Sequence, residues 1–187
     1  MFPRFASVRL QEALKDSPVV LVHGPRQSGR TTLARSVGEP LGFAYVSFDD
    51  PAVLTAAAAD PVGFLDDLPG RTILDEVQRA PGLFSALKMT VDRDRSPGRF
   101  LLTGSANVLL VPRMADSLAG RMSILRLHPL AQCEVAGKDP GFLDRLFNSS
   151  FKIRTLPRLG PQLAERIAGG GFPAALARTD RPSSQYQ

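Results

Sequence analysis

A chain of 187 residues is long enough for one well-buried core and short for two. Hydrophobic residues make up 43% and charged residues 22%, which is typical of a globular protein and excludes fibrous and disordered classes. The net charge of +5 arises beyond residue 120, where the chain has 10 basic and 5 acidic side chains; residues 1–120 carry 13 of each. Because no apolar run approaches the roughly 18 to 20 residues that cross a bilayer, we predict a cytoplasmic protein without membrane contact.

Apolar patterns predict strands that alternate with helices. Five short runs rich in branched apolar residues predict strands at residues 19–22, 43–48, 72–74, 100–103 and 124–127. Helical spacing or composition predicts helices at residues 4–14, 31–37, 51–68 with a break near Pro61, 82–93 and 107–118. This alternation predicts an α/β fold, a parallel sheet with helices on both faces.

Turn residues become frequent beyond Leu127, where only two short helices are predicted, at residues 142–147 and 162–167. The last residues are polar and rich in serine and glutamine, which predicts a disordered tail. We therefore predict three parts: an α/β core over residues 1–128, a small helical extension over 129–178 and a tail over 179–187.

Residues 24–32, GPRQSGRTT, directly follow the first predicted strand and match the phosphate-loop pattern G-x-x-x-x-G-K-[ST] at every position except the lysine, where Arg30 stands. Gly24 and Gly29 let backbone amides turn toward an anion, and the helix that starts near Thr31 adds the positive end of its dipole. The loop therefore predicts binding of ATP. The predicted nucleotide-binding residues are Gly24, Pro25, Arg26, Gln27, Ser28, Gly29, Arg30, Thr31 and Thr32.

Arg30 keeps the positive charge of the usual lysine but replaces a compact ammonium with a broad, planar guanidinium. Arginine can still pair with phosphate. If its guanidinium is too broad to fit inside the loop, hydrolysis would slow while nucleotide binding stays intact. Two hypotheses therefore stay open: an ATPase in which Arg30 works, and a nucleotide-binding module with little or no hydrolysis. Thr31 supplies the hydroxyl expected to ligate Mg²⁺.

The apolar run that ends in Asp75 and Glu76 has the pattern of a Walker B motif. We predict that Asp75 holds the magnesium, directly or through water, and that Glu76 polarises the attacking water. Adjacent residues at a strand end point in different directions, so that one acid faces the metal and the other the γ-phosphate. A solvated acidic turn is the alternative, and the position after a phosphate loop favours the motif.

Two further segments supply candidate catalytic residues. Thr103 or Ser105, at the end of the fourth predicted strand, is a candidate to hydrogen-bond the γ-phosphate or the attacking water, and a helix N-cap is the alternative for Ser105. Arg121, just before the fifth predicted strand, is a candidate to stabilise transition-state charge in its own or a neighbouring subunit. Arg113 and Arg26 are weaker candidates for that task.

The segments GPRQSGRTTLA, ILDEVQRAP, LLTGSAN and SLAGRM followed by LHPL resemble the AAA-type P-loop ATPases of bacteria and archaea known only as ATP-binding proteins. The resemblance runs in the same order from about residue 4 to GGGFP at residues 169–173. It implies ATP binding and hydrolysis and a sheet of order 5-1-4-3-2. Family members have lysine where this chain has Arg30 and continue into a C-terminal domain of unknown function, so we expect a fragment or a truncated gene product.

The leading hypothesis is thus a magnesium-dependent ATPase with ATP and ADP as its ligands. A small-molecule kinase is disfavoured because Glu76 would waste ATP by activating water. A nucleic-acid-binding protein is disfavoured because the arginines of the basic final third are scattered. A homo-oligomer is plausible, because hydrolysis in such enzymes usually depends on a neighbour's arginine. A protein client is also expected, and the sequence does not name it.

Overall fold

The computed structural model describes residues 2–105, 118–138, 141–148 and 160–178. It divides the chain into two compact units, Phe5–His128 and the combination of Met1–Arg4 with Pro129–Gln187. The helix predicted at residues 107–118 lies, apart from its last residue, outside the described residues, as does the predicted tail. Among the described residues no helix is long and apolar enough to cross a membrane.

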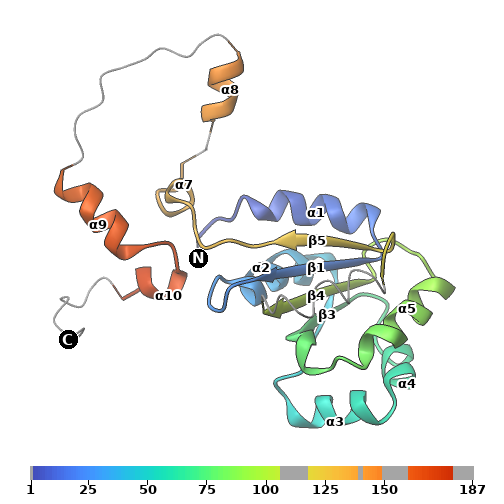
Figure 1. Ribbon diagram of the computed structural model, residues 1–187. Coiled ribbons are helices and arrows are strands. Elements are labelled where there is room, and N and C mark those ends of the chain that lie inside the picture. The colour runs from blue at the N-terminus through green and yellow to red at the C-terminus, as the bar shows by residue number, and fades with distance from the viewer. Residues whose placement is uncertain (1, 106–117, 139–140, 149–159, 179–187) are drawn as a thin grey trace. The chain divides into compact units, whose positions relative to one another are not determined.

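The unit Phe5–His128 is built on a parallel sheet that contains all five predicted strands (Figure 1). The strands are β1 (Val19–Gly24), β2 (Ala44–Ser47), β3 (Thr72–Asp75), β4 (Phe100–Ser105) and β5 (Met122–Arg126). Their order is β2-β3-β4-β1-β5 and every pairing is parallel, which confirms the predicted order. Because β1 lies between β4 and β5, the loop that leaves its C-terminal end has sheet on both sides.

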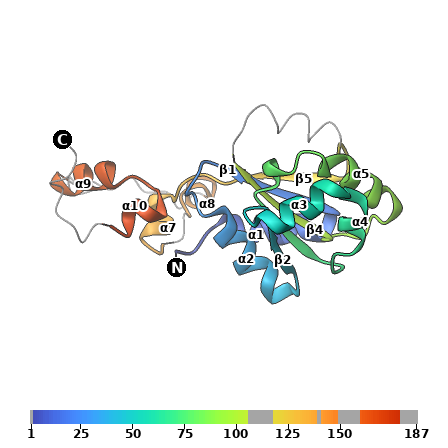
Figure 2. The same cartoon turned by 90° about the horizontal axis from the view of Figure 1, so that it is seen from below.

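Helices lie on both faces of this sheet, as predicted (Figures 1 and 2). They are α1 (Ala6–Asp16), α2 (Arg30–Gly38), α3 (Pro51–Ala59), α4 (Pro61–Asp66) and α5 (Leu83–Arg93), with the short 3-10 helices η1 (Glu39–Leu41) and η2 (Val77–Arg79). The break predicted near Pro61 is confirmed. The carboxylate of Asp60 accepts a hydrogen bond of 2.9 Å from the Gly63 amide, which caps α4, and Pro61 suits the first helical position.

The core forms because successive strand residues face opposite sides of the sheet. Leu21 and Leu102 belong to a buried cluster with side chains from α3, α4 and α5. Their neighbours Val20 and Leu101 belong to a second cluster with side chains from α1 and α2. Strands buried on both faces read as continuous apolar runs, which is the pattern that made them recognisable in the sequence.

The described residues of the second unit form four short helices. They are α7 (Gln132–Val135), α8 (Phe142–Phe147), α9 (Pro161–Gly169) and α10 (Pro173–Leu176). α8 and α9 match the predicted helices, whereas α7 and α10 were missed because a single turn shows no periodicity. Glu134, 5% exposed, holds part of this unit together: it accepts a 2.9 Å hydrogen bond from the Ala131 amide and pairs with Arg4 Nε at 3.3 Å.

Gly24 allows a close approach between β1 and the chain after β5, and this yields a prediction about stability. A methyl group at Gly24 would lie 2.2 Å from the carbonyl oxygen of Leu127, whereas one at Gly70 would meet no atom within 4 Å. We expect Gly24→Ala to lower the free energy of unfolding by about 1–3 kcal/mol, the usual cost of overpacking. Chemical denaturation measures this, with Gly70→Ala as the matched control. Equal stability of the two variants would contradict the close approach.

Candidate nucleotide site

The loop of residues 24–32 presents backbone amides at the start of α2. Gln27 and Gly29 have positive φ angles of 62° and 91°, so the chain turns through left-handed conformations that glycine adopts without strain. The first helical bond of α2 runs from the Leu33 amide to the Gly29 carbonyl at 2.9 Å, which leaves the three preceding amides without a helical acceptor. No side chain caps this helix in the described part of the chain. The loop therefore has the donors that an anion requires.

Arg30 is buried against the loop, with 6% of its surface exposed. Its Nη1 donates to the carbonyl of Gly24 at 2.5 Å and to that of Pro25 at 3.3 Å. Its Nη2 donates to Oε1 of Glu76 at 2.8 Å, which forms an ion pair between the loop and the end of β3. The guanidinium thus joins the two predicted motifs directly.

Asp75, the last residue of β3, is 4% exposed and receives hydroxyl groups from three different elements. Its Oδ1 accepts from Thr31 Oγ1 of α2 at 2.8 Å and from Thr103 of β4. Its Oδ2 accepts from the hydroxyl of Tyr45 on β2 at 3.0 Å. A buried carboxylate is costly without such partners, and these three satisfy it.

Glu76 follows in a left-handed conformation, with φ of 58° and ψ of 43°, which is uncommon for a residue other than glycine. This turn carries the chain out of β3, so the two adjacent acids face different partners. Oε1 of Glu76 meets Arg30, and Oε2 accepts a hydrogen bond from the side chain of Gln78. Sequence reasoning missed both Gln78 and Tyr45, because neither belongs to the phosphate-loop or Walker B pattern.

Thr103, a candidate to hydrogen-bond the γ-phosphate or the attacking water, lies beside both acids, and that role stays a prediction. Its side chain is fully buried, with an exposed fraction of 0%. The hydroxyl donates to Asp75 and accepts from the amide of Glu76 at 3.2 Å. Thr103 therefore fixes the two acids relative to each other. The backbone amide of Ser105 donates to Gln78 Oε1 at 3.2 Å. The alternative role of Ser105, as the N-cap of a following helix, concerns a helix outside the described residues.

Arg121 lies at the opposite edge of the sheet, which corrects the prediction that it contacts a phosphate of its own subunit. It precedes β5, and its carbonyl accepts from the amide of Val19, the first residue of β1. The six residues of β1 separate it from the loop by roughly 16 Å. Its guanidinium is bound to Asp92 of α5 and to the carbonyl of Ala119. A role toward a neighbouring subunit stays a prediction, as does that of the exposed Arg26, and Arg113 lies outside the described residues.

His23, at the end of β1, reports the charge around the loop. Burial lowers its pKa most, and the positive charges of Arg126 and Arg30 lower it further, followed by His128. Its Nδ1 has no hydrogen-bond partner among the described residues. Arg126 and Arg30 together make this end of the sheet favourable for an anion.

Side-chain oxygen atoms at this edge of the sheet also suit a magnesium ion that arrives with a nucleotide. Thr31 and Asp75 offer the hard oxygen ligands that Mg²⁺ prefers, and they lie next to the uncapped loop. The part of the chain that is described holds no group of three or more His, Cys, Asp or Glu residues able to bind a metal.

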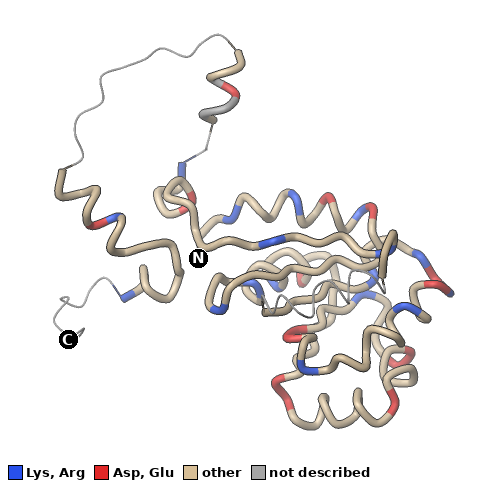
Figure 3. Tube along the Cα trace, viewed as in Figure 1, with Lys and Arg blue, Asp and Glu red and all other residues tan. Residues whose placement is uncertain are grey.

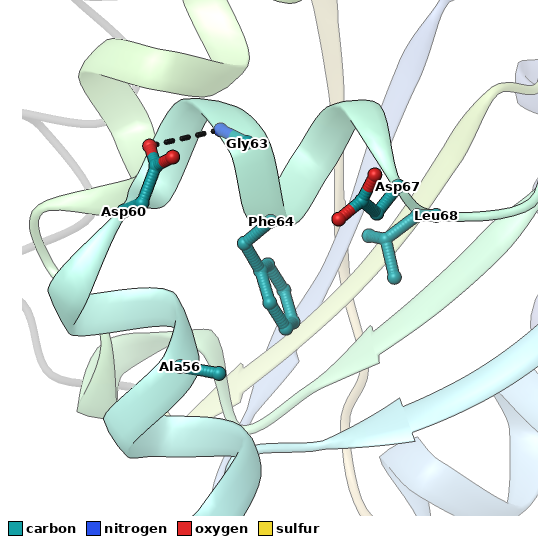
Figure 4. Close-up of a pocket in the computed structure, with 6 residues that line it drawn as sticks. All are labelled: Ala56, Asp60, Gly63, Phe64, Asp67 and Leu68. Carbon is teal, nitrogen blue, oxygen red and sulfur yellow. Dashed lines mark hydrogen bonds between the residues drawn. The ribbon is translucent and has the colours of Figure 1, made fainter.

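A separate hollow of about 300 Å³ lies between α3 and α4 and is unsuited to phosphate. Figure 4 shows the carboxylates of Asp60 and Asp67 on its rim, with the ring of Phe64 between them. Acidic residues mark the ends of both helices in Figure 3. These carboxylates would repel an anion, so the loop after β1 is the better candidate for the nucleotide site.

Comparisons with known proteins agree with this geometry. The AAA domain family matches residues 16–136. Two uncharacterised proteins, one of Mycobacterium tuberculosis and one of Mycobacterium bovis, are each 43% identical over 132 residues, which cover 71% of this chain and 30% of each relative. The chain thus spans about a third of the length of these relatives. A Walker-type ATPase of Pyrococcus abyssi has a TM-score of 0.55 at 16% identity, covering 92% of this chain and 65% of that one, and shows the fold alone.

A five-stranded parallel sheet with a phosphate loop after β1, which lies between β4 and β5, defines a P-loop nucleotide-binding domain. The chain belongs to the AAA domain family, within the AAA-type P-loop ATPases. The resemblance stated from the sequence motifs is therefore confirmed for the family and the fold. The C-terminal domain of unknown function that the resemblance implies stays a prediction.

Tyr45 yields a prediction about pH. Partial burial, and after it the hydrogen bond to Asp75, raises the pKa of Tyr45 above its ordinary value of about 10. The neutral phenol is thus favoured by folding, and the stability it contributes is present below pH 10 and is lost as the pH rises through the higher folded value. The chain has no tryptophan and only Tyr186 besides, so ultraviolet titration of a Tyr186→Phe protein reports Tyr45 alone. Asp75→Ala should lower the midpoint part way, because burial is the larger cause.

An unperturbed midpoint of about 10 in the Tyr186→Phe protein would contradict this contact. Tyr45→Phe serves as the spectroscopic blank, since it removes the remaining phenol. It should also lower the free energy of unfolding at neutral pH by about 1 kcal/mol through the lost hydrogen bond.

Proposed function

We propose that this domain binds magnesium-ATP in the loop of residues 24–32 and hydrolyses it to ADP and phosphate. The observation that carries the proposal is the meeting of three features at one edge of the sheet. An uncapped helix start lies beside a hydroxyl–carboxylate pair, Thr31 Oγ1 and Asp75 Oδ1 at 2.8 Å, and a second acid, Glu76, follows directly. Thr31 and Asp75 would hold Mg²⁺, which would neutralise charge on the phosphates.

Each residue has a separate task in this proposal. The loop amides and Arg30 hold the phosphates, and Thr31 and Asp75 hold the metal ion. Glu76 orients a water molecule toward the γ-phosphorus and takes a proton from it. The oxygen of that water bonds to phosphorus, the bond from phosphorus to the bridging oxygen breaks, and ADP leaves with the bridging oxygen.

The ion pair between Arg30 and Glu76 supports a coupling between binding and hydrolysis. Both groups are largely buried, with side-chain exposures of 6% and 20%, and they meet at 2.8 Å. A polyphosphate carries more negative charge than a carboxylate and competes for the same guanidinium. We infer that Arg30 exchanges Glu76 for phosphate when ATP binds, which frees Oε1 of Glu76 for water.

The same ion pair favours a second candidate, a nucleotide-binding module with little or no hydrolysis. Arg30 is fixed at several points, because it also donates to the carbonyls of Gly24 and Pro25. If the guanidinium keeps Glu76 while the loop amides bind phosphate, no carboxylate oxygen reaches the water. A homo-oligomer and a protein client remain part of either proposal, and turnover distinguishes the two.

Substitution of Arg30 and of Glu76 tests the proposal. We expect wild type to bind magnesium-ATP and to release phosphate. Glu76→Gln should bind with similar affinity while kcat falls by about 10²- to 10⁴-fold, the usual contribution of a general base. Arg30→Lys should raise kcat by up to about tenfold, a barrier difference of about 1.4 kcal/mol, because one ammonium cannot hold the loop carbonyls and Glu76 in the same way. Calorimetry and phosphate release on the same samples measure both quantities.

Arg9→Lys is the matched control, since Arg9 is exposed on α1. Turnover in Arg30→Lys without turnover in wild type would establish the second candidate. Binding of magnesium-ATP by neither protein would refute the nucleotide site, and turnover equal to that of Glu76→Gln in both would refute hydrolysis.

A further inference from the structure

Gln78 is bound at both ends of its side-chain amide. Its Nε2 donates to Oε2 of Glu76, and its Oε1 accepts from the backbone amide of Ser105 at 3.2 Å. A backbone amide only donates, so the amide group of Gln78 has a single orientation that satisfies both contacts. Gln78 therefore links Glu76 at the end of β3 with the end of β4.

The local backbone is arranged to make this link. The left-handed conformation of Glu76 turns the chain at the end of β3, so η2 brings Gln78 back toward the carboxylate two residues earlier. Val77, fully buried, anchors η2 in the core. Across from it, a methyl group at Gly104 would lie 3.2 Å from Oε1 of Gln78, so the glycine leaves the room that the amide occupies.

The two oxygens of Glu76 thus have partners of different kinds. Oε1 is bound by the charged guanidinium of Arg30, and Oε2 by the neutral amide of Gln78. A phosphate competes strongly for the cation and has much less attraction for a neutral amide that is already bound to both Glu76 and Ser105. When Arg30 moves to the phosphate, Gln78 keeps its place.

We propose that Gln78 is the positioning residue of the hydrolysis step, which holds Oε2 of Glu76 so that Oε1 points at the attacking water. The inference rests on the proposed ATPase function and adds to it a residue outside both motifs. A neutral donor fixes the direction of the carboxylate without cancelling the negative charge that polarises water. Gln78 itself touches neither nucleotide nor metal in this scheme.

Gln78→Met tests the role, because methionine has a similar length and lacks both the donor and the acceptor. We expect kcat for ATP to fall by about 10- to 100-fold, the effect of a misplaced reacting group, while KM and the calorimetric affinity for magnesium-ATP stay within about twofold of the parent. Gln11→Met on the exposed face of α1 is the matched control and should change neither value. Gln78→Glu, which keeps the size and replaces the donor by an oxygen, should lower kcat at least as much.

Two measurements separate positioning from a general structural role. In a Glu76→Gln background, Gln78→Met should lower kcat no further, because a residue that acts through Glu76 has lost its target. Without nucleotide, the side-chain amide resonance of Gln78, assigned by its loss in Gln78→Met, should shift in Glu76→Ala. An unchanged resonance, or an equal loss of kcat in both backgrounds, would overturn the proposal.

The outcomes also distinguish this inference from the proposed function. If wild type and Arg30→Lys both bind magnesium-ATP and neither hydrolyses it, the ATPase function fails and the role of Gln78 fails with it. If either protein hydrolyses ATP and Gln78→Met and Gln78→Glu in that protein keep its kcat, only the role of Gln78 is refuted.

Discussion

The arrangement of this site depends on the hydrogen bonds that the buried carboxylate of Asp75 accepts. Asp75 is 4% exposed, and a charge at that depth is stable only when hydrogen bonds replace the water it has lost. Thr31, Tyr45 and Thr103 provide those bonds from α2, β2 and β4. One buried group therefore sets where the helix after the phosphate loop lies relative to three neighbouring strands. Two of these residues, Thr31 and Asp75, are also the ones proposed to hold Mg²⁺.

The second constraint is the left-handed turn at Glu76. Such a conformation costs about 1–3 kcal/mol in a residue other than glycine and persists only where the surroundings enforce it. The enforcing contacts are the bond from the Glu76 amide to Thr103 and the burial of Val77. The turn aims the Glu76 carboxylate at Arg30 and brings Gln78 back beside it. Strain in the backbone is thus located at the residue proposed to direct water.

Much of the fold followed from the sequence because strands buried on both faces have a simple apolar pattern, and the motifs then placed the loop after β1. The side-chain contacts within the site were harder to predict from the sequence. The sequence predicted a role for Thr103 toward the γ-phosphate or the attacking water, but it did not predict that the buried hydroxyl bonds to Asp75 and to the Glu76 amide. The misplacement of Arg121 was avoidable, because a residue just before a parallel strand lies at the edge opposite the carboxyl ends. Tyr45 carried no signal, because only the packing of β2 against β3 brings its hydroxyl to Asp75.

The arginine in the phosphate loop changes what the loop and the Walker B motif do to each other. A lysine has one nitrogen, so it contacts the loop carbonyls and an acid only from a single point. The guanidinium spans the distance, with Nη1 on Gly24 and Nη2 on Glu76. The contact of Arg30 with the loop carbonyl and its contact with Glu76 are therefore made together by one guanidinium and are not independent. In the proposed ATPase, a phosphate that draws the guanidinium away releases the loop carbonyls and Glu76 together, so the strength of this ion pair relative to an arginine–phosphate contact would set how much of the bound ATP is hydrolysed.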